Sequence, residues 1–238
     1  MFRSFTRRTN QLERLDTGDY TEEEYELWLR EMRWINRLFG DSRALKLSIR
    51  DSSNGNRQRI SVLDVGAGCG ELLKTAAESI GEDRSLLVGA ELSSRAARAI
   101  QARSPEFGVL SVQCDAMRLP FPDNSFDLVI SSLFLHHLDD IQGISLLREM
   151  GRVARRRIIV IDLHRHPIAY YFYRFFSCFL LQRFTHEDGS LSILRSYRPE
   201  ELRELAEEAR LTDHEVRRRF PYRLVLTAAP NTDTIDER

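Results

Sequence analysis

The strongest constraint on the fold is a run of ten residues, 62–71, that reads Val-Leu-Asp-Val-Gly-Ala-Gly-Cys-Gly-Glu. Residues 60–65 are mostly apolar and predict a buried strand, and the alternate glycines predict a tight turn into a helix over 71–80. In an open parallel sheet, ligands bind at the carboxyl ends of the strands. Glycines there let the backbone approach the ligand, and the first helical turn offers free N–H groups. The run therefore predicts an α/β fold with a ligand site at this turn.

Short apolar strands and helices alternate after this turn. We expect further strands at 85–91, 109–114, 126–131 and 157–162, and helices at 94–103 and 141–153. Strands alternating with helices form βαβ units, so the sheet should be mainly parallel. A helix that opens at 198–202 and two late strands, 214–220 and 222–227, complete the expected elements.

Size and composition limit the protein to a few classes. The chain has 238 residues, 42% hydrophobic and 30% charged, which fits one soluble α/β domain with additions. The net charge of -1 argues against a nucleic-acid partner. Three widely spaced cysteines without a CxxC motif indicate neither a disulfide framework nor a zinc site. No secretory signal and no apolar run of about 18 residues occur, so we expect a cytoplasmic protein without a transmembrane segment.

The N-terminal part predicts a helical cap. Thr21 and Glu24 form a capping box, Gly40 is a suitable stop, and the helix between them has one apolar face. That face contains Tyr25, Trp28, Leu29, Met32, Ile35 and Phe39. A second short helix is expected at 43–49, and 51–58 is a polar loop. We predict a helical extension over 1–52, a catalytic domain over 53–230 and a loose tail over 231–238.

The glycine turn does not fit a dinucleotide site. That fingerprint requires a third glycine at position 71, where this chain has Glu71, and its third glycine is Gly70. Asp64 precedes the turn, and a carboxylate there would repel a pyrophosphate but attract a cationic group. Glu91 ends the next strand, where a carboxylate can accept both hydroxyls of a ribose. Asp115 ends the third strand, where it can accept from an adenine amino group.

Together with later motifs, these residues resemble class I S-adenosylmethionine (SAM)-dependent methyltransferases. The matching segments are Asp64 to Gly70, Glu91, Asp115-Ala116, Leu119-Pro120-Phe121, Phe126-Asp127-Leu128-Val129 and Leu135-His136-His137-Leu138. The similarity covers residues 58–165 and is strongest to the small-molecule type that includes the ubiquinone/menaquinone biosynthesis methyltransferases. It implies a Rossmann-like, seven-stranded sheet in the order 3-2-1-4-5-7-6, with the last strand antiparallel.

The resemblance also implies a set of cofactor contacts for SAM, with S-adenosylhomocysteine as the product. The expected cofactor-binding residues are Asp64, Gly66, Ala67, Gly68, Gly70, Glu91, Leu92, Asp115, Ala116, Met117 and Ser131. Cys69, inside the turn, is assigned no chemistry. Methyltransferases that act on amines carry an Asn/Asp-Pro-Pro-Tyr/Phe motif after the fourth strand. This chain has Ser131-Ser132-Leu133-Phe134 there, which argues against an amine acceptor of that kind.

Four polar residues follow the fourth and fifth strands and are catalytic candidates. His136 and His137 come after the fourth strand, and Asp162 and His164 come at the end of the fifth. A histidine can act as a base at neutral pH, but each of the four could instead pack or cap a loop. No metal site is predicted, because His136, His137, His164 and His166 have no cysteine or close set of carboxylates in the sequence.

Residues 167–181 are rich in aromatic side chains. The aromatics are Tyr170, Tyr171, Phe172, Tyr173, Phe175, Phe176 and Phe179. The segment could be a lid over a flat or greasy substrate, a buried helix, or a surface that docks shallowly on a membrane. Residues 186–192 are expected to form a loop, and the whole lid insertion to cover about 164–197.

These observations predict a SAM-dependent methyltransferase that acts on an oxygen or carbon of a small hydrophobic molecule, such as an aromatic ring, a quinone or a polyketide. A non-catalytic SAM-fold partner protein remains an alternative. A nicotinamide-dependent oxidoreductase is a further one, although it would require glycine at 71 and a Tyr-x-x-x-Lys set, which does not occur. The acceptor and the oligomeric state, monomer or homodimer, stay open.

Overall fold

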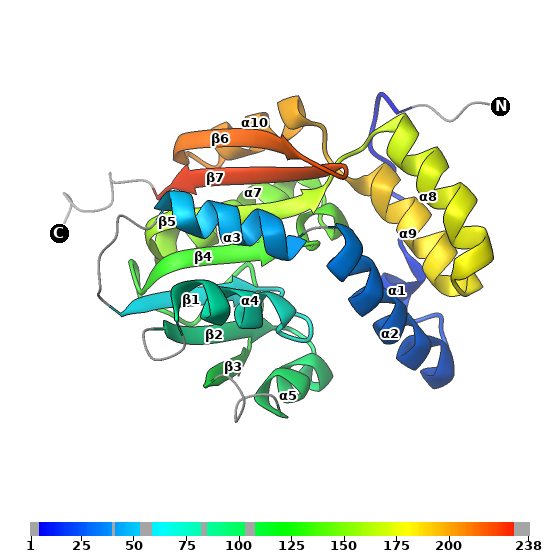
Figure 1. Cartoon of the computed structure of the whole chain (residues 1–238). Coiled ribbons are helices and arrows are strands. Elements are labelled where there is room, and N and C mark those ends of the chain that lie inside the picture. Colours follow the sequence, from blue (N-terminus) through cyan, green and yellow to red (C-terminus); the bar gives the residue numbers. More distant parts are fainter. Residues whose placement is uncertain (1–4, 40, 53–58, 82–84, 103–107, 231–238) are drawn as a thin grey trace.

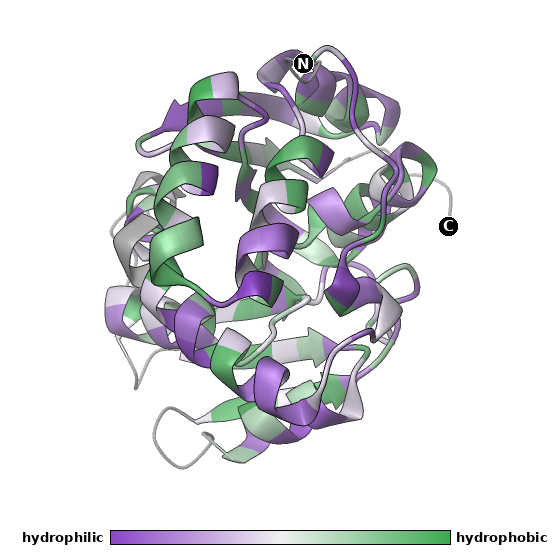
Figure 2. Ribbon diagram, turned by 90° about the vertical axis from the view of Figure 1, so that its right-hand side faces the viewer, coloured by the Kyte–Doolittle hydropathy of each residue, from purple (hydrophilic) through white to green (hydrophobic). Residues whose placement is uncertain are grey.

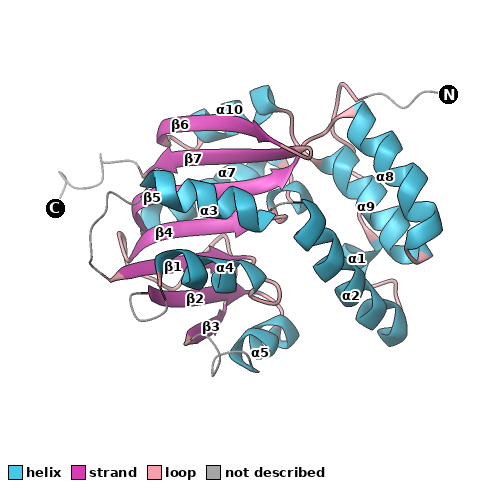
Figure 3. Ribbon diagram, viewed as in Figure 1, coloured by secondary structure: helices cyan, strands magenta, loops and turns pink. Residues whose placement is uncertain are grey.

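A computed structural model describes residues 5–39, 41–52, 59–81, 85–102 and 108–230. The described strands form one seven-stranded sheet in the order β3-β2-β1-β4-β5-β7-β6 (Figures 1 and 3). Their bounds are β1 Ile60–Val65, β2 Ser85–Glu91, β3 Val109–Gln113, β4 Phe126–Ser132, β5 Ala154–Leu163, β6 Thr212–Arg219 and β7 Arg223–Ala229. β7 is antiparallel to both β5 and β6, and the other pairs are parallel. The predicted fold and strand order are confirmed.

Helices cover both faces of the sheet. Their bounds are α1 Arg14–Thr17, α2 Glu22–Phe39, α3 Asp41–Ser52, α4 Glu71–Ile80, α5 Ser94–Ala102, η2 Leu135–His137, α7 Asp140–Val153, α8 Pro167–Leu180, α9 Arg183–Arg195 and α10 Pro199–Glu208. Successive residues of β1 alternate between the two layers. Val62 packs with α3 and α4, and Leu63 packs with α7 and α10. This period of two explains why the buried strands read as continuous apolar runs.

α3 belongs to the helical layer on the sheet. It packs against α4, and Leu45 and Ile49 are buried in the same core cluster as β1 and β7. At its first residue, Asp41 Oδ1 accepts a hydrogen bond from Arg223 Nε of β7 at 2.5 Å, and both side chains are buried. The packed core of the sheet thus begins upstream of residue 53, where the sequence predicts the catalytic domain to start. Gly40, the side chain of Phe39, loop residues 53–58 and the tail 231–238 lie outside the described residues.

A second group of helices stands at the carboxyl ends of the parallel strands. It consists of α1, α2, α8 and α9, on the right in Figure 1. The predicted apolar face of α2 packs toward α9, where Trp28 stacks on Phe184 with ring centroids 6.3 Å apart. None of the helices in the described part of the chain is long and apolar enough to cross a bilayer.

The prediction of a loop at 186–192 is wrong, because these residues lie within α9. The helix is buried on nearly all sides, including the polar residues Thr185, Asp188 and Ser192, so it has no clear apolar stripe in the sequence. Gly189 lies where α8 packs closely, and a Cβ there would overlap with the hydroxyl of Tyr173. Tertiary packing has therefore overridden local propensity in this helix.

The Asp41–Arg223 pair gives a test of how α3 is held. Arg223→Leu leaves a buried carboxylate without its guanidinium, so we expect the free energy of unfolding to fall by about 3–5 kcal/mol. The double variant Asp41→Ala/Arg223→Leu should lose less than the sum of the two single variants. As a control, Lys46→Ala removes a half-exposed ion pair with Glu78 and should cost less than about 1 kcal/mol. Urea unfolding of the wild type, the two single variants, the double variant and Lys46→Ala measures these losses, and equal losses for Arg223→Leu and Lys46→Ala would contradict the assignment.

Candidate functional site

The glycine turn lies at the carboxyl end of β1, between β1 and α4. Gly66, Gly68 and Gly70 have φ angles of 72°, 55° and 74°, a left-handed conformation that favours glycine. Gly66 N donates to Ala90 O of β2 at 3.0 Å, which fixes the turn against the neighbouring strand. A Cβ on Gly66 would lie 2.8 Å from Phe134 Cγ, so the turn and the segment after β4 are in close contact.

Two acidic residues lie beside this turn. Glu91 Oε1 accepts from Gly68 N at 2.6 Å, and Glu91 Oε2 accepts from Leu92 N at 3.1 Å. Asp64 is buried at the end of β1. Burial raises the pKa of Glu91, while burial and the nearby Glu91 carboxylate raise the pKa of Asp64. The turn is thus flanked by two carboxyl groups in an environment that disfavours their negative charge.

The remaining cofactor candidates have different surroundings. Asp115 is exposed at the end of β3, and its Oδ1 accepts from Met117 N at 2.9 Å, while Leu92 is 70% exposed. These side chains lie at the same strand edge as Glu91. Ser131 is buried, and its Oγ donates to Val65 O of β1 at 2.8 Å. In this structure, therefore, Ser131 fastens β4 to β1 just before the turn.

Two of the catalytic candidates form a buried pair. His136 Nδ1 and Asp162 Oδ1 are 2.6 Å apart, and Asp162 Oδ2 accepts from His136 N at 3.0 Å. Burial raises the pKa of Asp162, but the His136 contacts outweigh it, so the pKa lies below its usual value. When Nδ1–H donates to Asp162, Nε2 of His136 is left as the free ring nitrogen. His136 is part of η2, and this short helix begins directly after Phe134, whose ring contacts the glycine turn.

The N-terminal segment brings two further acids to this pair. Glu13 Oε1 lies 3.9 Å from His136 Nε2 and 4.0 Å from His137 Nδ1, and Asp16 Oδ1 lies 2.8 Å from His137 Nδ1. Burial raises the pKa of Glu13 to about 7. Burial also acts on Asp16, but the hydrogen bond with His137 outweighs it and lowers the pKa to about 2. The structure thus adds Glu13 and Asp16 to the predicted site.

Arg195 and Arg8 hold these parts together. The buried guanidinium of Arg195 donates to His136 O at 3.1 Å, to His137 O at 2.5 Å and to Asp16 Oδ2 at 2.5 Å. Arg8 donates to Arg195 O at 2.5 Å and to Leu138 O at 2.8 Å. Sequence reasoning missed all of these residues, because their partners are more than fifty positions away and no local motif marks them.

His164 does not join this cluster. It is buried, and its backbone N donates to Tyr222 O at 3.0 Å, beside the β6–β7 hairpin. Burial lowers the pKa of His164 to about 4, and the charges that act on it come from His166, Arg218, Glu200 and Arg165. The structure therefore brings together His136, His137 and Asp162, and places His164 among other partners.

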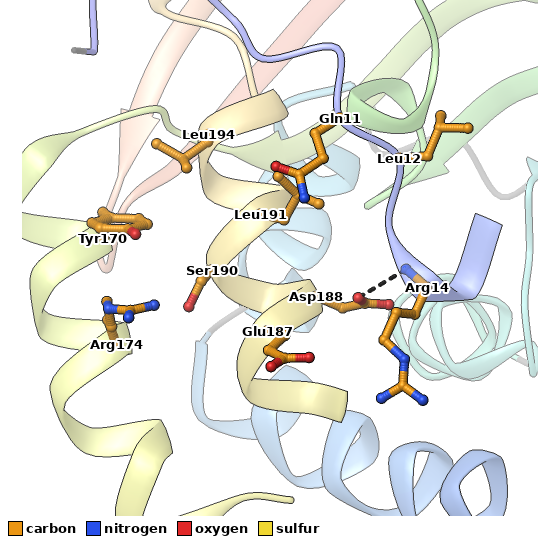
Figure 4. Close-up of a pocket in the computed structure, with 10 residues that line it drawn as sticks. All are labelled: Gln11, Leu12, Arg14, Tyr170, Arg174, Glu187, Asp188, Ser190, Leu191 and Leu194. Carbon is orange, nitrogen blue, oxygen red and sulfur yellow. Dashed lines mark hydrogen bonds between the residues drawn. The ribbon is translucent and has the colours of Figure 1, made fainter. Parts of the chain in front are cut away.

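The aromatic segment 167–181 forms α8, and most of its aromatic rings face solvent. The exposed fractions of Phe172, Phe175 and Phe179 are 52%, 61% and 74%. Figure 2 shows hydrophobic residues along most of this helix. The inner side of α8 borders a pocket of about 350 Å³ against α9 and the N-terminal segment (Figure 4). That pocket is lined largely by polar and charged residues, including Arg14, Arg174 and Asp188, so it is unlike the predicted greasy pocket.

Comparison with protein families gives one clear match. A family model described as a methyltransferase domain matches residues 63–161, which run from β1 to β5. These residues contain the glycine turn, Glu91, Asp115 and His136. The predicted class I methyltransferase family is confirmed for this part of the chain, against the nicotinamide-dependent alternative.

Curated relatives match the same region. A ubiquinone/menaquinone biosynthesis C-methyltransferase from Pseudoalteromonas translucida is 31% identical over 135 residues, which cover 52% of this chain and 53% of the relative. The enzyme of that name from Stenotrophomonas maltophilia is 37% identical over 97 residues, 40% of this chain and 38% of the relative. The chain thus spans about half the length, or less, of the curated relatives it matches.

Solved structures share the fold at low identity. A SAM-dependent methyltransferase from Aquifex aeolicus has a TM-score of 0.59 at 18% identity, covering 84% of this chain and 98% of that chain. A magnesium protoporphyrin IX methyltransferase from Synechocystis with bound SAH has a TM-score of 0.57 at 17% identity, covering 81% and 84%. At these identities the similarity establishes the fold alone.

The close contact of Gly66 with Phe134 can be tested against a matched glycine. Gly66→Ala introduces a Cβ into a left-handed backbone conformation, which lowers the free energy of unfolding by about 1–2 kcal/mol. The same Cβ overlaps with the Phe134 ring, which lowers it by about 1–3 kcal/mol more. Gly68→Ala meets no atom within 4 Å, so we expect only the backbone cost of about 1–2 kcal/mol. Urea unfolding of both variants gives the comparison. Equal losses would show that Phe134 does not restrict this turn.

Proposed function

Because residues 63–161 belong to the methyltransferase-domain family, we propose that this chain transfers the methyl group of SAM to a carbon or oxygen of a small hydrophobic acceptor. The observation that carries the proposal is the glycine turn of β1 with Glu91 bonded to it and Phe134 packed behind it. The same strand edge holds the buried His136–Asp162 pair. One end of the parallel sheet thus offers both a donor site and a polar group beside it.

The three strand ends would bind the three parts of SAM. The methionine end would lie on residues 64–70, because its ammonium group compensates the buried carboxyl of Asp64. The ribose hydroxyls would donate to the carboxylate of Glu91, which in this structure accepts from Gly68 N and Leu92 N. The adenine would lie between Asp115, Ala116, Met117 and the exposed side chain of Leu92. Ser131 would act indirectly, by holding β4 against β1.

The acceptor would bind on the side of η2. Methyl transfer is an in-line displacement. The protein must therefore hold the acceptor atom in line with the methyl carbon, opposite the sulfonium sulfur, and keep water away. His136, held by Asp162, lies two residues after Phe134, whose ring contacts the glycine turn. Glu13, the residue before α1, and Arg195, the last residue of α9, cover this position. We therefore assign His136, His137 and Asp162 to the acceptor side, and His164 to the support of the β6–β7 hairpin.

The exposed aromatics of α8 favour a lipid-soluble acceptor that is taken from a membrane surface. Phe172, Phe175, Phe176, Phe179 and Leu180 are all more than two-fifths exposed, and no acidic residue lies on the helix. Arg174 on this helix and Arg183 just after it are also exposed. Aromatic and apolar side chains with flanking arginines are typical of helices that lie in the interface of an anionic bilayer.

The cofactor assignment is tested by isothermal titration calorimetry with SAM and with NAD. We expect binding of SAM and none of NAD, and Glu91→Ala should weaken SAM binding by about tenfold to a hundredfold, since it removes charge-assisted hydrogen bonds worth about 1.5–3 kcal/mol. Glu78→Ala, a half-exposed carboxylate of α4, should bind like the wild type. Tight binding of NAD without SAM would refute the function, and unchanged affinity in Glu91→Ala would refute its ribose role.

The membrane assignment is tested by sedimentation with vesicles of phosphatidylcholine and phosphatidylglycerol. Phe175→Ser/Phe179→Ser removes two exposed rings, each worth about 1.5–3 kcal/mol when buried, so partitioning should fall at least tenfold. The matched control is Leu110→Ser, an apolar residue 50% exposed on the edge strand β3. Equal partitioning of wild type and double variant would refute docking through α8 and leave the methyltransferase proposal intact.

A further inference from the structure

We propose that Glu13, His136 and His137 form a binding site for a divalent transition-metal ion, with zinc as its best fit. One ligand atom from each residue lies within 4.8 Å of the others. Glu13 and His136 are buried, and His137 is half-buried. Two imidazoles and one carboxylate are a ligand set that zinc takes in proteins. The three residues come from two segments that the sequence separates by more than a hundred positions.

The burial of the Glu13 carboxylate is a second, independent indication that a ligand binds here. Its side chain is only 3% exposed, and Oε1 has no hydrogen-bond partner within the described part of the protein. The atoms nearest to it in the cluster are His136 Nε2 at 3.9 Å and His137 Nδ1 at 4.0 Å. A buried carboxylate oxygen without a partner is costly, so an additional ligand is expected at this point.

The spacing fits an ion after a small closure of the side chains. Zinc binds nitrogen and oxygen at about 2.0–2.2 Å, so two ligand atoms on a tetrahedral ion are about 3.4 Å apart. The distances of 3.9 and 4.0 Å in the structure exceed this by about half an ångström. Rotation of the Glu13 side chain can provide such a shift without moving the helices.

The neighbours of the cluster match those of known zinc sites. Ligand histidines usually donate their second ring nitrogen to a carboxylate, which fixes the ring and raises its basicity. Asp162 takes this position toward His136 Nδ1, at 2.6 Å. His137 Nδ1, the ring nitrogen 4.0 Å from Glu13 Oε1, lies 2.8 Å from Asp16 Oδ1, so it binds the ion only when this contact with Asp16 is given up.

The local charges also favour a cation. The carboxylates of Glu13, Asp16 and Asp162 surround the two rings; Arg195 lies among them, with its Nε 3.8 Å from Glu13 Oε1, and Arg8, which reaches His136 O, is paired with Asp140. Arg195 is already paired with Asp16 at 2.5 Å. Glu13 and Asp162 therefore remain to compensate a divalent ion. Imidazole nitrogens select zinc, cobalt or nickel over magnesium and calcium, which prefer oxygen ligands.

The site goes beyond methyl transfer and can be tested without it. If the proposed function holds, the ion would lie on the acceptor side, next to Phe134 and the glycine turn. A bound divalent ion lowers the pKa of an acceptor hydroxyl or enol and so prepares an oxygen or an adjacent carbon for attack. Nε2 of His136 would then be a ligand of the ion, and the proton lost by the acceptor hydroxyl or enol would pass to solvent water.

The experiment measures metal content and affinity in the full chain, free of any histidine tag and without SAM. The protein is produced in zinc-supplemented medium, so that metal can enter while the N-terminal segment folds. We expect about one equivalent of zinc by elemental analysis, removal by a chelator, and rebinding of zinc and cobalt but not of magnesium. Cobalt should give the visible absorption bands of a coordinated ion.

Two variants and two matched controls decide the result. Glu13→Gln and His137→Asn should each lower zinc affinity at least tenfold and lose the rise of the Tm that zinc produces in the wild type. Glu187→Gln and His186→Asn make the same changes on α9 outside the cluster and should bind zinc like the wild type. Circular dichroism checks that all four proteins fold. Absence of zinc from the wild type, or equal binding in all five proteins, would overturn the site.

Discussion

The buried guanidinium of Arg195 is the interaction on which the candidate site depends. It lies at the end of α9 and donates to the carbonyls of His136 and His137 and to the carboxylate of Asp16. Three segments far apart in the sequence thereby meet on one side chain that is 4% exposed. A guanidinium is suited to this, because its planar donors serve several acceptors at fixed angles. Without it, His137 O would lose this donor and His136 O would keep only Arg8, at the point where the sheet meets the second group of helices.

The sequence predicted the parts of the fold whose signal is local. Val62 and Leu63 face opposite layers because a strand alternates its side chains, and the glycines at 66–70 accept a left-handed backbone that other residues resist. Asp64 and Glu91 were found because they end consecutive parallel strands, whose carboxyl ends must meet at one edge. Each of these inferences needs only a short stretch of chain.

What the sequence missed depends on contacts between distant segments. Glu13 and Asp16 have no motif that relates them to His136 and His137, since only the path of the N-terminal segment brings them together. The sequence predicts a loop at 186–192, within α9, because burial on nearly all sides leaves no amphipathic stripe. The sequence shows that residues 167–181 are rich in aromatic side chains, but it does not show which side of the helix packs against the rest of the protein. Only Ala169, Tyr170 and Ser177 of this helix are buried among its described side chains.

Three buried carboxyl groups at the carboxyl edge of the sheet show how the site is balanced. Asp162 has His136 as a partner, and the pKa of Asp162 is lowered despite its burial. Asp64 and Glu13 are as deeply buried, and burial raises the pKa of both; the Arg195 guanidinium 3.8 Å from Glu13 does not outweigh this effect. A protein keeps such groups inside at a cost in stability, which a positively charged ligand can offset. The methionine ammonium of SAM would do so at Asp64, and a metal ion would do so at Glu13. The methyl donor and the metal ion would thus each bring the positive charge that the buried carboxyl beside it requires.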